Sequence, residues 1–346
     1  MFGGDLTDPS SSRARLSGRA LGAAGFAPVW LALAALLLVA GVAAPRTLSG
    51  TSLSQIWPFA SVMAVAALGE MLVVMTGGID LSVPAVITMV GTVVLGVSSG
   101  SNGQLTEAVL IALGLAAAVG VVNGLLVAYL GLNPLMVTLA VGQIVLGLTT
   151  EYRARIANES LVPAALSGWA SGRLLGITNL LWIGLAITAV VAILLNRARV
   201  GRRLQAVGAN PRAAWIAGID VRRYTAAGYV AAALLYGSAG ILLAGFLRTP
   251  TLTIGTPYLL GPIAAVVIAG ASLSGGLASA LSTWVAAFAL TVLETMLRVM
   301  GLPSALQFVV FGTAIAAGMV VSGDRIVALL WRTRVLRVAS SGAATR

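Results

Sequence analysis

Few polar or ionisable side chains lie within the apolar runs of this chain, and the one in the most unusual setting is Asp80. It lies in the stretch from Met75 to Pro84, between the apolar runs Ile56 to Met75 and Leu81 to Val97. Each run is long enough, or nearly so, to cross a hydrocarbon core of about 30 Å. An ionisable residue is therefore expected at a break between two membrane helices.

The residues around Asp80 explain how such a break could form. Gly77 and Gly78 release the backbone from the first helix, Asp80 or Ser82 can cap the second, and Pro84 fits the first turn of that second helix. Broken backbone at membrane depth must lie against protein or a water-filled path. The break is thus a candidate gate or pathway, and the alternative is an ordinary capped turn at the membrane surface.

Other polar side chains within the apolar runs are few, and each should face protein or water because hydrocarbon cannot solvate it. Glu70 could line a pathway or couple two helices. Glu294 and Arg298 have the spacing of an ion pair on one helix, expected near the outer surface. The candidate residues of the pathway or gate are Glu70, Gly77, Gly78, Asp80, Ser82, Asn123 and Asn133.

Composition places the chain among polytopic membrane proteins. Of its 346 residues 59% are hydrophobic and 9% charged, which leaves no room for a separate soluble domain. The sequence predicts an all-α protein of about ten transmembrane helices. They are expected near Val29–Ala44, Ile56–Met75, Leu81–Val97, Ala108–Leu130, Leu135–Thr149, Leu180–Leu195, Tyr224–Phe246, Pro262–Ala271, Ala278–Val299 and Ala305–Val321. The segment Pro262–Ala271 could be a partial span.

The basic residues, all 21 of them arginine, predict the topology. With a cytoplasmic N-terminus, ten crossings place fifteen arginines inside, as the positive-inside rule requires. This gives a cytoplasmic tail over 1–27, a transmembrane permease domain over 28–323 and a second cytoplasmic tail over 324–346. Short arginine groups beside apolar spans do not form a nucleic-acid surface. The longest outer loop, 150–179, could receive a soluble partner or simply connect two helices.

Two further segments have sequence patterns that indicate contacts, one with a partner protein and one between helices in the membrane. The inner loop 196–224 has the pattern of a short amphipathic helix, a turn at Gly208 to Pro211 and a second short helix ending at Gly218. Such helices suit docking to another protein, whereas a loop that only fixes topology needs no such pattern. In the membrane, Gly120 and Gly124 form a small-residue motif that lets helix backbones approach closely.

The chain has no histidine, no cysteine and no phosphate-binding loop after a strand. It also has no nucleophile with an adjacent base. We therefore expect no catalytic site, no metal site and no cofactor bound by this chain itself.

Three motifs together resemble the ribose-type permeases of ATP-binding-cassette importers. They are Thr76–Val83, Gly201–Ile219 and Ile263–Gly276, within a similarity that covers roughly Val29 to Val321. The resemblance implies the permease fold of these importers and a location in the bacterial plasma (inner) membrane. It also implies a second permease subunit, cytoplasmic subunits that bind ATP, and an extracytoplasmic binding protein that delivers a monosaccharide. The residues that would couple to the ATPase are Gly201, Arg202, Gly208, Asn210, Ala213, Ala214, Gly218 and Ile219.

Other functions stay open at this point. The same family could carry a nucleoside, a signalling sugar or a branched amino acid. An ion-coupled secondary carrier would need no ATPase, but the charged residues within the spans are too few for obvious ion coupling. A membrane enzyme would need a catalytic constellation, which the sequence lacks.

Overall fold

The computed structural model of the chain describes residues 27–156, 160–303 and 305–322. Apart from Ala27, the predicted tails 1–27 and 324–346 lie outside these residues. The described residues are almost entirely helical, as predicted. Their helices are α2 (Ala27–Ala43), α3 (Gly50–Val74), α4 (Val83–Ser98), α5 (Leu105–Ala128), α6 (Pro134–Arg153), α7 (Ala164–Ser171), α8 (Asn179–Arg197), α9 (Arg199–Ala209), α10 (Pro211–Ile216), α11 (Val221–Leu247), α12 (Gly261–Ile268), α13 (Ala280–Val299) and α14 (Ala305–Ser322).

Each of the ten predicted spans contains a helix, but the helices differ in length. Six are long and apolar enough to cross a membrane, namely α3, α5, α6, α8, α11 and α13. Helix α12 has only 8 residues, so at 1.5 Å per residue it is about 12 Å long and cannot cross alone. The prediction of a polytopic helical protein is therefore confirmed, and that of ten full crossings only in part.

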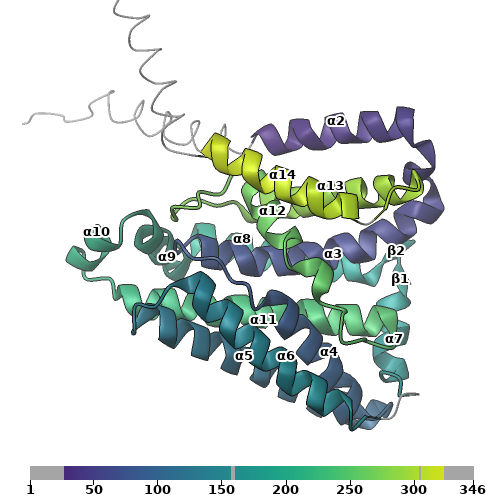
Figure 1. Ribbon diagram of the computed structural model, residues 1–346, viewed down its shortest axis with the longest axis horizontal. Coiled ribbons are helices and arrows are strands. Elements are labelled where there is room, and N and C mark those ends of the chain that lie inside the picture. Colours follow the sequence, from purple (N-terminus) through teal and green to yellow (C-terminus); the bar gives the residue numbers. More distant parts are fainter. Residues whose placement is uncertain (1–26, 157–159, 304, 323–346) are drawn as a thin grey trace, which may run out of the picture.

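Helix α3 forms the centre of the molecule (Figure 1). It packs against α8, α11, α12 and α13, and every residue from Ala60 to Val74 is buried. A membrane helix that is apolar and buried on all sides contacts protein rather than lipid. By contrast, only about a third of α5, α6 and α8 is buried in this single chain, so those helices form an outer layer.

Close approach of α5 and α11 depends on Gly120 and Gly124, which confirms the predicted packing motif. A Cβ added at Gly120 would lie 2.7 Å from the Cα of Val230, and one at Gly124 would lie 2.9 Å from the Cα of Ala226. No side chain fits in either position. The two helices therefore pack backbone against backbone, as small residues permit in membranes.

Two non-helical segments interrupt the helical bundle. The first, 75–82, joins α3 to α4. The second, 248–260, joins α11 to α12 and contains the short 3₁₀ helix η3 (Thr256–Tyr258). The second segment contacts the first two turns of α4, where the Gly255 amide donates to Thr88 Oγ1 at 3.2 Å. A Cβ on Gly255 would collide with the Pro84 carbonyl oxygen, so the contact is made by backbone.

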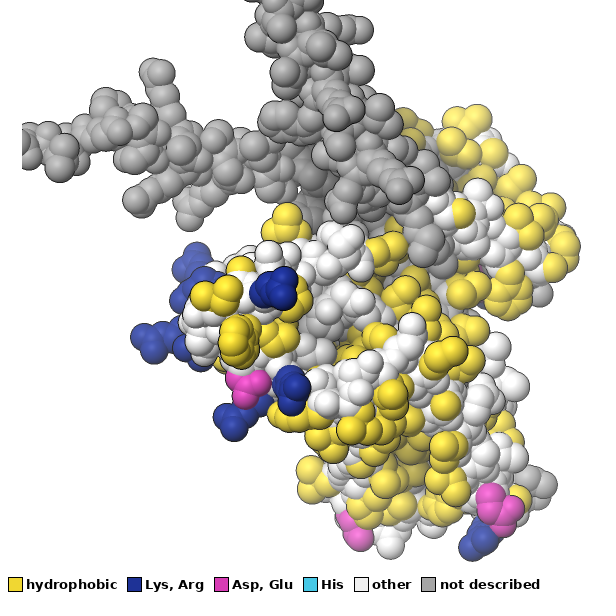
Figure 2. Space-filling view, turned by 60° about the vertical axis from the view of Figure 1, so that its left-hand side comes forward, with side chains coloured by type: hydrophobic (Ala, Val, Ile, Leu, Met, Phe, Trp, Pro, Cys, Tyr) yellow, Lys and Arg dark blue, Asp and Glu magenta, His cyan; other side chains and the backbone are white. Residues whose placement is uncertain are grey.

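The two ends of the bundle differ in structure (Figure 1). Helices α9 and α10 form one end, here called the α9–α10 end. The opposite, hairpin end has α7, the 3₁₀ helices η1 (Pro45–Leu48) and η2 (Asn102–Gln104), and the antiparallel strands β1 (Arg173–Leu174) and β2 (Ile177–Thr178). Arginine side chains gather over the α9–α10 end (Figure 2), where the sequence places the inner loop.

The glycine contact between α5 and α11 gives the first test. We expect Gly120→Val to lower the free energy of unfolding by about 1 to 3 kcal/mol, because the added side chain overpacks the interface. Gly114→Val is the matched control, since no atom lies within 4 Å of a Cβ there. Thermal unfolding of both variants in detergent measures the difference. Equal loss of stability in both would contradict this packing.

Candidate functional site

The break begins where α3 ends, and its two glycines are required for different reasons. Gly77 has a φ of +81°, a conformation open to glycine at little cost. Its amide and that of Gly78 donate to the carbonyl oxygens of Val74 and Val73 at 2.9 and 3.2 Å, which closes the helix end. Gly78 is required for space, because a Cβ would collide with the hydroxyl of Tyr229.

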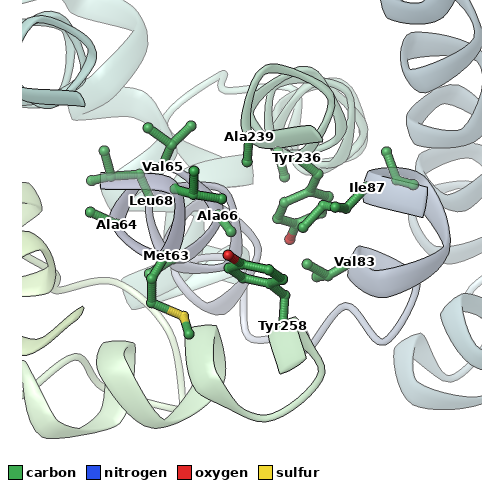
Figure 3. Close-up of a cluster of buried hydrophobic side chains, with 14 of the residues drawn as sticks. Met63, Ala64, Val65, Ala66, Leu68, Val83, Ile87, Tyr236, Ala239 and Tyr258 are labelled. Atoms are coloured by element: carbon green, nitrogen blue, oxygen red, sulfur yellow. The ribbon is translucent and has the colours of Figure 1, made fainter. Parts of the chain in front are cut away.

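After these glycines the chain turns back along α3, and the side chain of Glu70 binds the backbone of the turn. The Asp80 amide donates to Glu70 Oε1 at 3.1 Å, and the Tyr236 hydroxyl donates to Glu70 Oε2 at 3.1 Å. Glu70 lies only about one turn before the last residue of α3. All three residues are buried, and Figure 3 shows Tyr236 pointing from α11 toward the space between α3 and α4. Glu70 therefore joins α3, the break and α11.

The rest of the break is held by side chains of α5 and α6. Asp80 Oδ1 accepts hydrogen bonds from the amide and the hydroxyl of Ser82, at 2.8 and 2.6 Å. The amide nitrogen of Asn123, on α5, donates to Ser82 Oγ at 3.0 Å. The Leu81 amide donates to Thr138 Oγ1, on α6, at 2.9 Å. We call Glu70, Asp80, Ser82, Asn123, Thr138 and Tyr236 the break network.

One detail of the predicted capping is wrong. Ser82 occupies the N-cap position of α4, but its side chain makes no capping bond, and Pro84 lies in the first turn as expected. Asp80 instead binds the amide of Ser82, one residue ahead of the helix. The carboxylate thus shapes the turn before α4, because the nearest unpaired donor there belongs to Ser82.

The structure brings together most of the predicted pathway residues, with one exception. Glu70, Asp80, Ser82 and Asn123 meet beside the two glycines. Asn133 instead caps α6, where its Oδ1 accepts from the Leu135 amide at 3.0 Å, and it is exposed. It makes no hydrogen bond to the break network among the described residues.

Sequence analysis missed Thr138 and two tyrosines. Tyr229 and Tyr236 are seven residues apart, so they lie on one face of α11, and both are fully buried. Two tyrosines with that spacing in an apolar helix were a usable signal. Their hydroxyls differ, since Tyr236 binds Glu70 while that of Tyr229 has no partner among the described residues.

The predicted coupling loop has the two-helix form that its sequence indicates. Asn210 Oδ1 accepts from the Ala213 amide at 3.0 Å and caps α10. Gly218, with a φ of +79°, ends the unit, where the Ile219 amide donates to the Ala214 carbonyl oxygen at 3.0 Å. At the start of α9, the Arg202 guanidinium donates to the Arg197 carbonyl oxygen at 2.8 Å, and Gly201 is pressed against the end of α8, where a Cβ would collide with backbone.

The end of α9 touches the break directly. A Cβ on Gly208 would collide with the carbonyl oxygen of Met75, the first residue after α3. The same oxygen accepts from the Gly276 amide at 2.9 Å, and Gly275 and Gly276 have φ values of +98° and +91°. All three motifs singled out in the sequence therefore meet at the carbonyl group of Met75.

The large exposed side chains of α10 belong to residues that sequence analysis did not single out. Trp215 and Ile216 are 71% and 75% exposed, and Arg212 beside them is exposed as well. Ala214 is buried against the protein instead. Two large apolar side chains exposed beside arginines suit a protein contact. Their presence in an otherwise basic loop was the available signal.

Comparison with known proteins decides the family. A family model described as branched-chain amino acid transport system / permease component matches residues 52–330. The chain belongs to this permease family.

Its relatives match over most of their length. The permease is 32% identical to the ribose import permease protein of Escherichia coli K12, over 85% of this chain and 92% of the relative. It is 33% identical to a "probable ABC transporter permease protein" of Sinorhizobium fredii, over 84% and 86%. The galactose/methyl galactoside import permease protein of Escherichia coli K12 is 29% identical, over 83% and 90%. No solved structure matches the chain.

The two tyrosines of α11 provide a matched test of the break network. Tyr236→Phe removes a hydrogen bond to a buried carboxylate, so we expect the free energy of unfolding to fall by about 1 to 3 kcal/mol. Tyr229→Phe removes a hydroxyl without a partner and should change stability little. Thermal unfolding of the two variants gives the comparison. If Tyr229→Phe were the more damaging change, the hydrogen-bond assignment would be wrong.

Proposed function

We propose that this chain is the membrane-spanning subunit of an ATP-binding-cassette importer that carries a monosaccharide. Two copies, or this chain and a related one, would enclose one pathway. Cytoplasmic partner subunits would bind and hydrolyse ATP, and an extracytoplasmic binding protein would deliver the sugar. This chain itself would perform no chemistry and bind no cofactor.

The observation that carries the proposal is the similarity to sugar permeases along nearly the whole chain. Relatives named for ribose and galactose import match over 90% or more of their length, so the similarity is not confined to one shared segment. The family model itself names branched-chain amino acids, and for that reason an amino acid is the second candidate solute. The meeting of the three sequence motifs at Met75 supports a common mechanical role for them.

The α9–α10 end is the proposed contact with the ATPase. Its exposed Trp215 and Ile216 supply apolar area, and the arginines around them favour a cytoplasmic position. Both chain termini would then be cytoplasmic as well. The hairpin end would face outward, where α7 and the exposed Trp169 offer a surface for the binding protein. Glu151 and Arg155 form an exposed ion pair of 2.9 Å at the end of α6, at this same end.

The break network is the proposed moving part of the pathway. Its polar groups are buried in this structure, so a path through it would open only when α3 and α4 shift relative to each other. Non-helical backbone and unpaired polar atoms are typical of such transport sites. Asn123 Oδ1 and the Tyr229 hydroxyl, both buried without a partner among the described residues, could form hydrogen bonds in another state.

Reconstituted transport is the direct test of this function. The chain is placed in vesicles with its partner ATPase and binding protein, and uptake of radiolabelled ribose, galactose and leucine is compared. We expect sugar uptake that requires ATP and both partners. Uptake driven by a sodium or proton gradient without ATP would overturn the proposal, and ATP-driven uptake of leucine alone would replace the sugar by an amino acid.

The proposed ATPase contact predicts separate effects of surface and interior changes on the loop. Trp215→Ser and Ile216→Asp should abolish co-purification with the ATPase without changing thermal stability, because both side chains are exposed. The control is Val200→Ser on α9, which is 61% exposed and should bind the ATPase normally.

Interior changes in the same loop should block uptake for a different reason. Gly208→Pro should displace α9 from Met75, and Ala214→Arg should force a charge into a buried position. Normal ATPase binding by the two α10 surface variants would exclude this docking surface.

Substitutions of Asp80 separate a gate from a purely structural turn. Asp80→Asn keeps the oxygen that Ser82 binds, whereas Asp80→Ala removes it, so a structural role predicts a stability loss of about 0.5 to 2 kcal/mol for Ala and little for Asn. A gate role predicts that both variants fold and insert but transport poorly. We expect the second result. Uptake that simply follows stability across the two variants would show that Asp80 only shapes the turn.

A further inference from the structure

A cavity of about 730 Å³ opens between the hairpin-end halves of α3, α11 and α13. The segment between α11 and α12 forms one side of the cavity, here called its floor, in which Ile254 and Tyr258 are buried. This volume lies in the range of small-molecule sites, about 300 to 1,000 Å³. None of the predicted pathway residues lines it, so it is distinct from the break network.

One wall of the cavity is a polar stripe on α13. Thr291, Glu294, Thr295 and Arg298 all line it, and their spacing of three and four residues places them on one face of the helix. A polar stripe on a membrane helix must face protein or water. Here it faces a hollow that no described side chain fills, which favours a polar occupant.

The polar groups of the stripe lie at increasing depth in the cavity, and three of its four residues can accept hydrogen bonds. Arg298 is 62% exposed at its side chain and Glu294 20%, while Thr291 is 4% exposed. The Thr291 and Thr295 hydroxyls donate to the carbonyl oxygens of Ala287 and Thr291, both at 2.9 Å. Their own oxygens, and the second carboxylate oxygen of Glu294, can therefore accept hydrogen bonds from hydroxyl groups.

Charge in the cavity is balanced. Among the described residues that line it, Glu294 and Arg298 are the only charged ones, and they bind each other at 2.6 Å. An anionic or cationic solute would have to break this pair. A neutral solute can instead bind beside it, and the charge of Glu294 strengthens the hydrogen bonds it accepts.

The opposite wall and the floor combine polar and apolar residues. Gln55 on α3 and Thr249, Thr251 and Thr253 of the 248–260 segment are polar, and the other residues that line this side are mainly apolar. Phe59 and Met63 on α3 and Tyr258 in the floor contribute flat or flexible apolar surface. Figure 3 shows Met63 and the Tyr258 ring beside α3. A molecule with one carbon-rich face and many hydroxyl groups matches both walls.

We propose that this cavity is a binding site for a neutral polyhydroxylated solute of monosaccharide size, with Thr291, Glu294 and Thr295 as its hydrogen-bonding wall and Phe59 and Tyr258 as its apolar wall. The inference rests on the proposed import function for the direction of access, which is from the hairpin end. Its floor is also the segment whose Gly255 binds Thr88 on α4. An occupant would therefore touch the segment that contacts α4, the helix that follows the break.

The absence of cysteine from the chain allows a clean chemical test. Thr295→Cys, in the complete transporter in vesicles, is exposed to a charged membrane-impermeant thiol reagent added at the outer side, with and without D-ribose or D-galactose. We expect labelling that slows about tenfold at a sugar concentration near ten times the dissociation constant. Thr150→Cys at the end of α6, exposed but outside the cavity, should be labelled without protection.

A second variant tests the role of Glu294. In the Thr295→Cys chain, Glu294→Gln should raise the sugar concentration for half-protection about tenfold, since a charge-assisted hydrogen bond is lost. Thr92→Val is the control, because the Thr92 hydroxyl is buried with no partner in the described segments and lies outside the cavity. It should leave protection unchanged.

The outcomes distinguish this inference from the proposed function. No labelling of Thr295→Cys, labelling that neither sugar slows, or protection by L-leucine alone would overturn the cavity assignment. ATP-driven sugar uptake by the unaltered chain, measured in the same vesicles, tests the function independently. Uptake without protection would refute the cavity assignment alone, and protection without ATP-driven uptake would refute the function alone.

Discussion

The structure depends on one requirement, which is that backbone amides released inside a membrane must find partners within the protein. Six of the seven amides from Thr76 to Ser82 donate hydrogen bonds to oxygens of the chain. Three donate to carbonyl oxygens at the end of α3, and the other three donate to Glu70, Thr138 and Asp80. The polar side chains that seemed available for transport chemistry are, in this state, what keeps the broken segment folded.

This requirement also links distant parts of the molecule. The partners of the break come from α3, α5, α6 and α11, so no one of these helices can move far without exposing a buried polar group. Such groups cost about 1 to 3 kcal/mol each when left unpaired. A change of state should therefore exchange one set of hydrogen bonds for another. The oxygens of Asn123 and Tyr229 that have no partner in the described part of the chain lie where a second set could form.

Local features of the fold could be predicted from the sequence, and long-range ones could not. The glycines of the break, the two short helices at 199–216 and the Gly120 contact follow from conformational freedom and residue size, which a short window of sequence records. The partners of Glu70 do not, because Tyr236 is 166 residues away and only packing decides which hydroxyl arrives. Sequence analysis missed the polar stripe of Thr291 and Thr295 for the same reason. A polar stripe on a helix can be interpreted only when the cavity that it faces is known.

The glycines explain how α9 could act on the break. At Gly208 and Gly276 the contacts with Met75 are made by backbone, and at Gly255 the backbone lies directly against the Pro84 carbonyl oxygen and the Thr88 hydroxyl. Side chains can absorb a displacement of about an ångström by changing rotamer, whereas close-packed backbones transmit it. A shift of α9 would reach the Met75 carbonyl and then Glu70 and Asp80, while a shift of the cavity floor would reach α4 through Gly255. The first contact reaches the 75–82 segment directly, and the second reaches α4, the helix that follows this segment. If α9 binds the ATPase and the cavity binds the solute as proposed, the 75–82 segment and α4 are where the two signals would be combined.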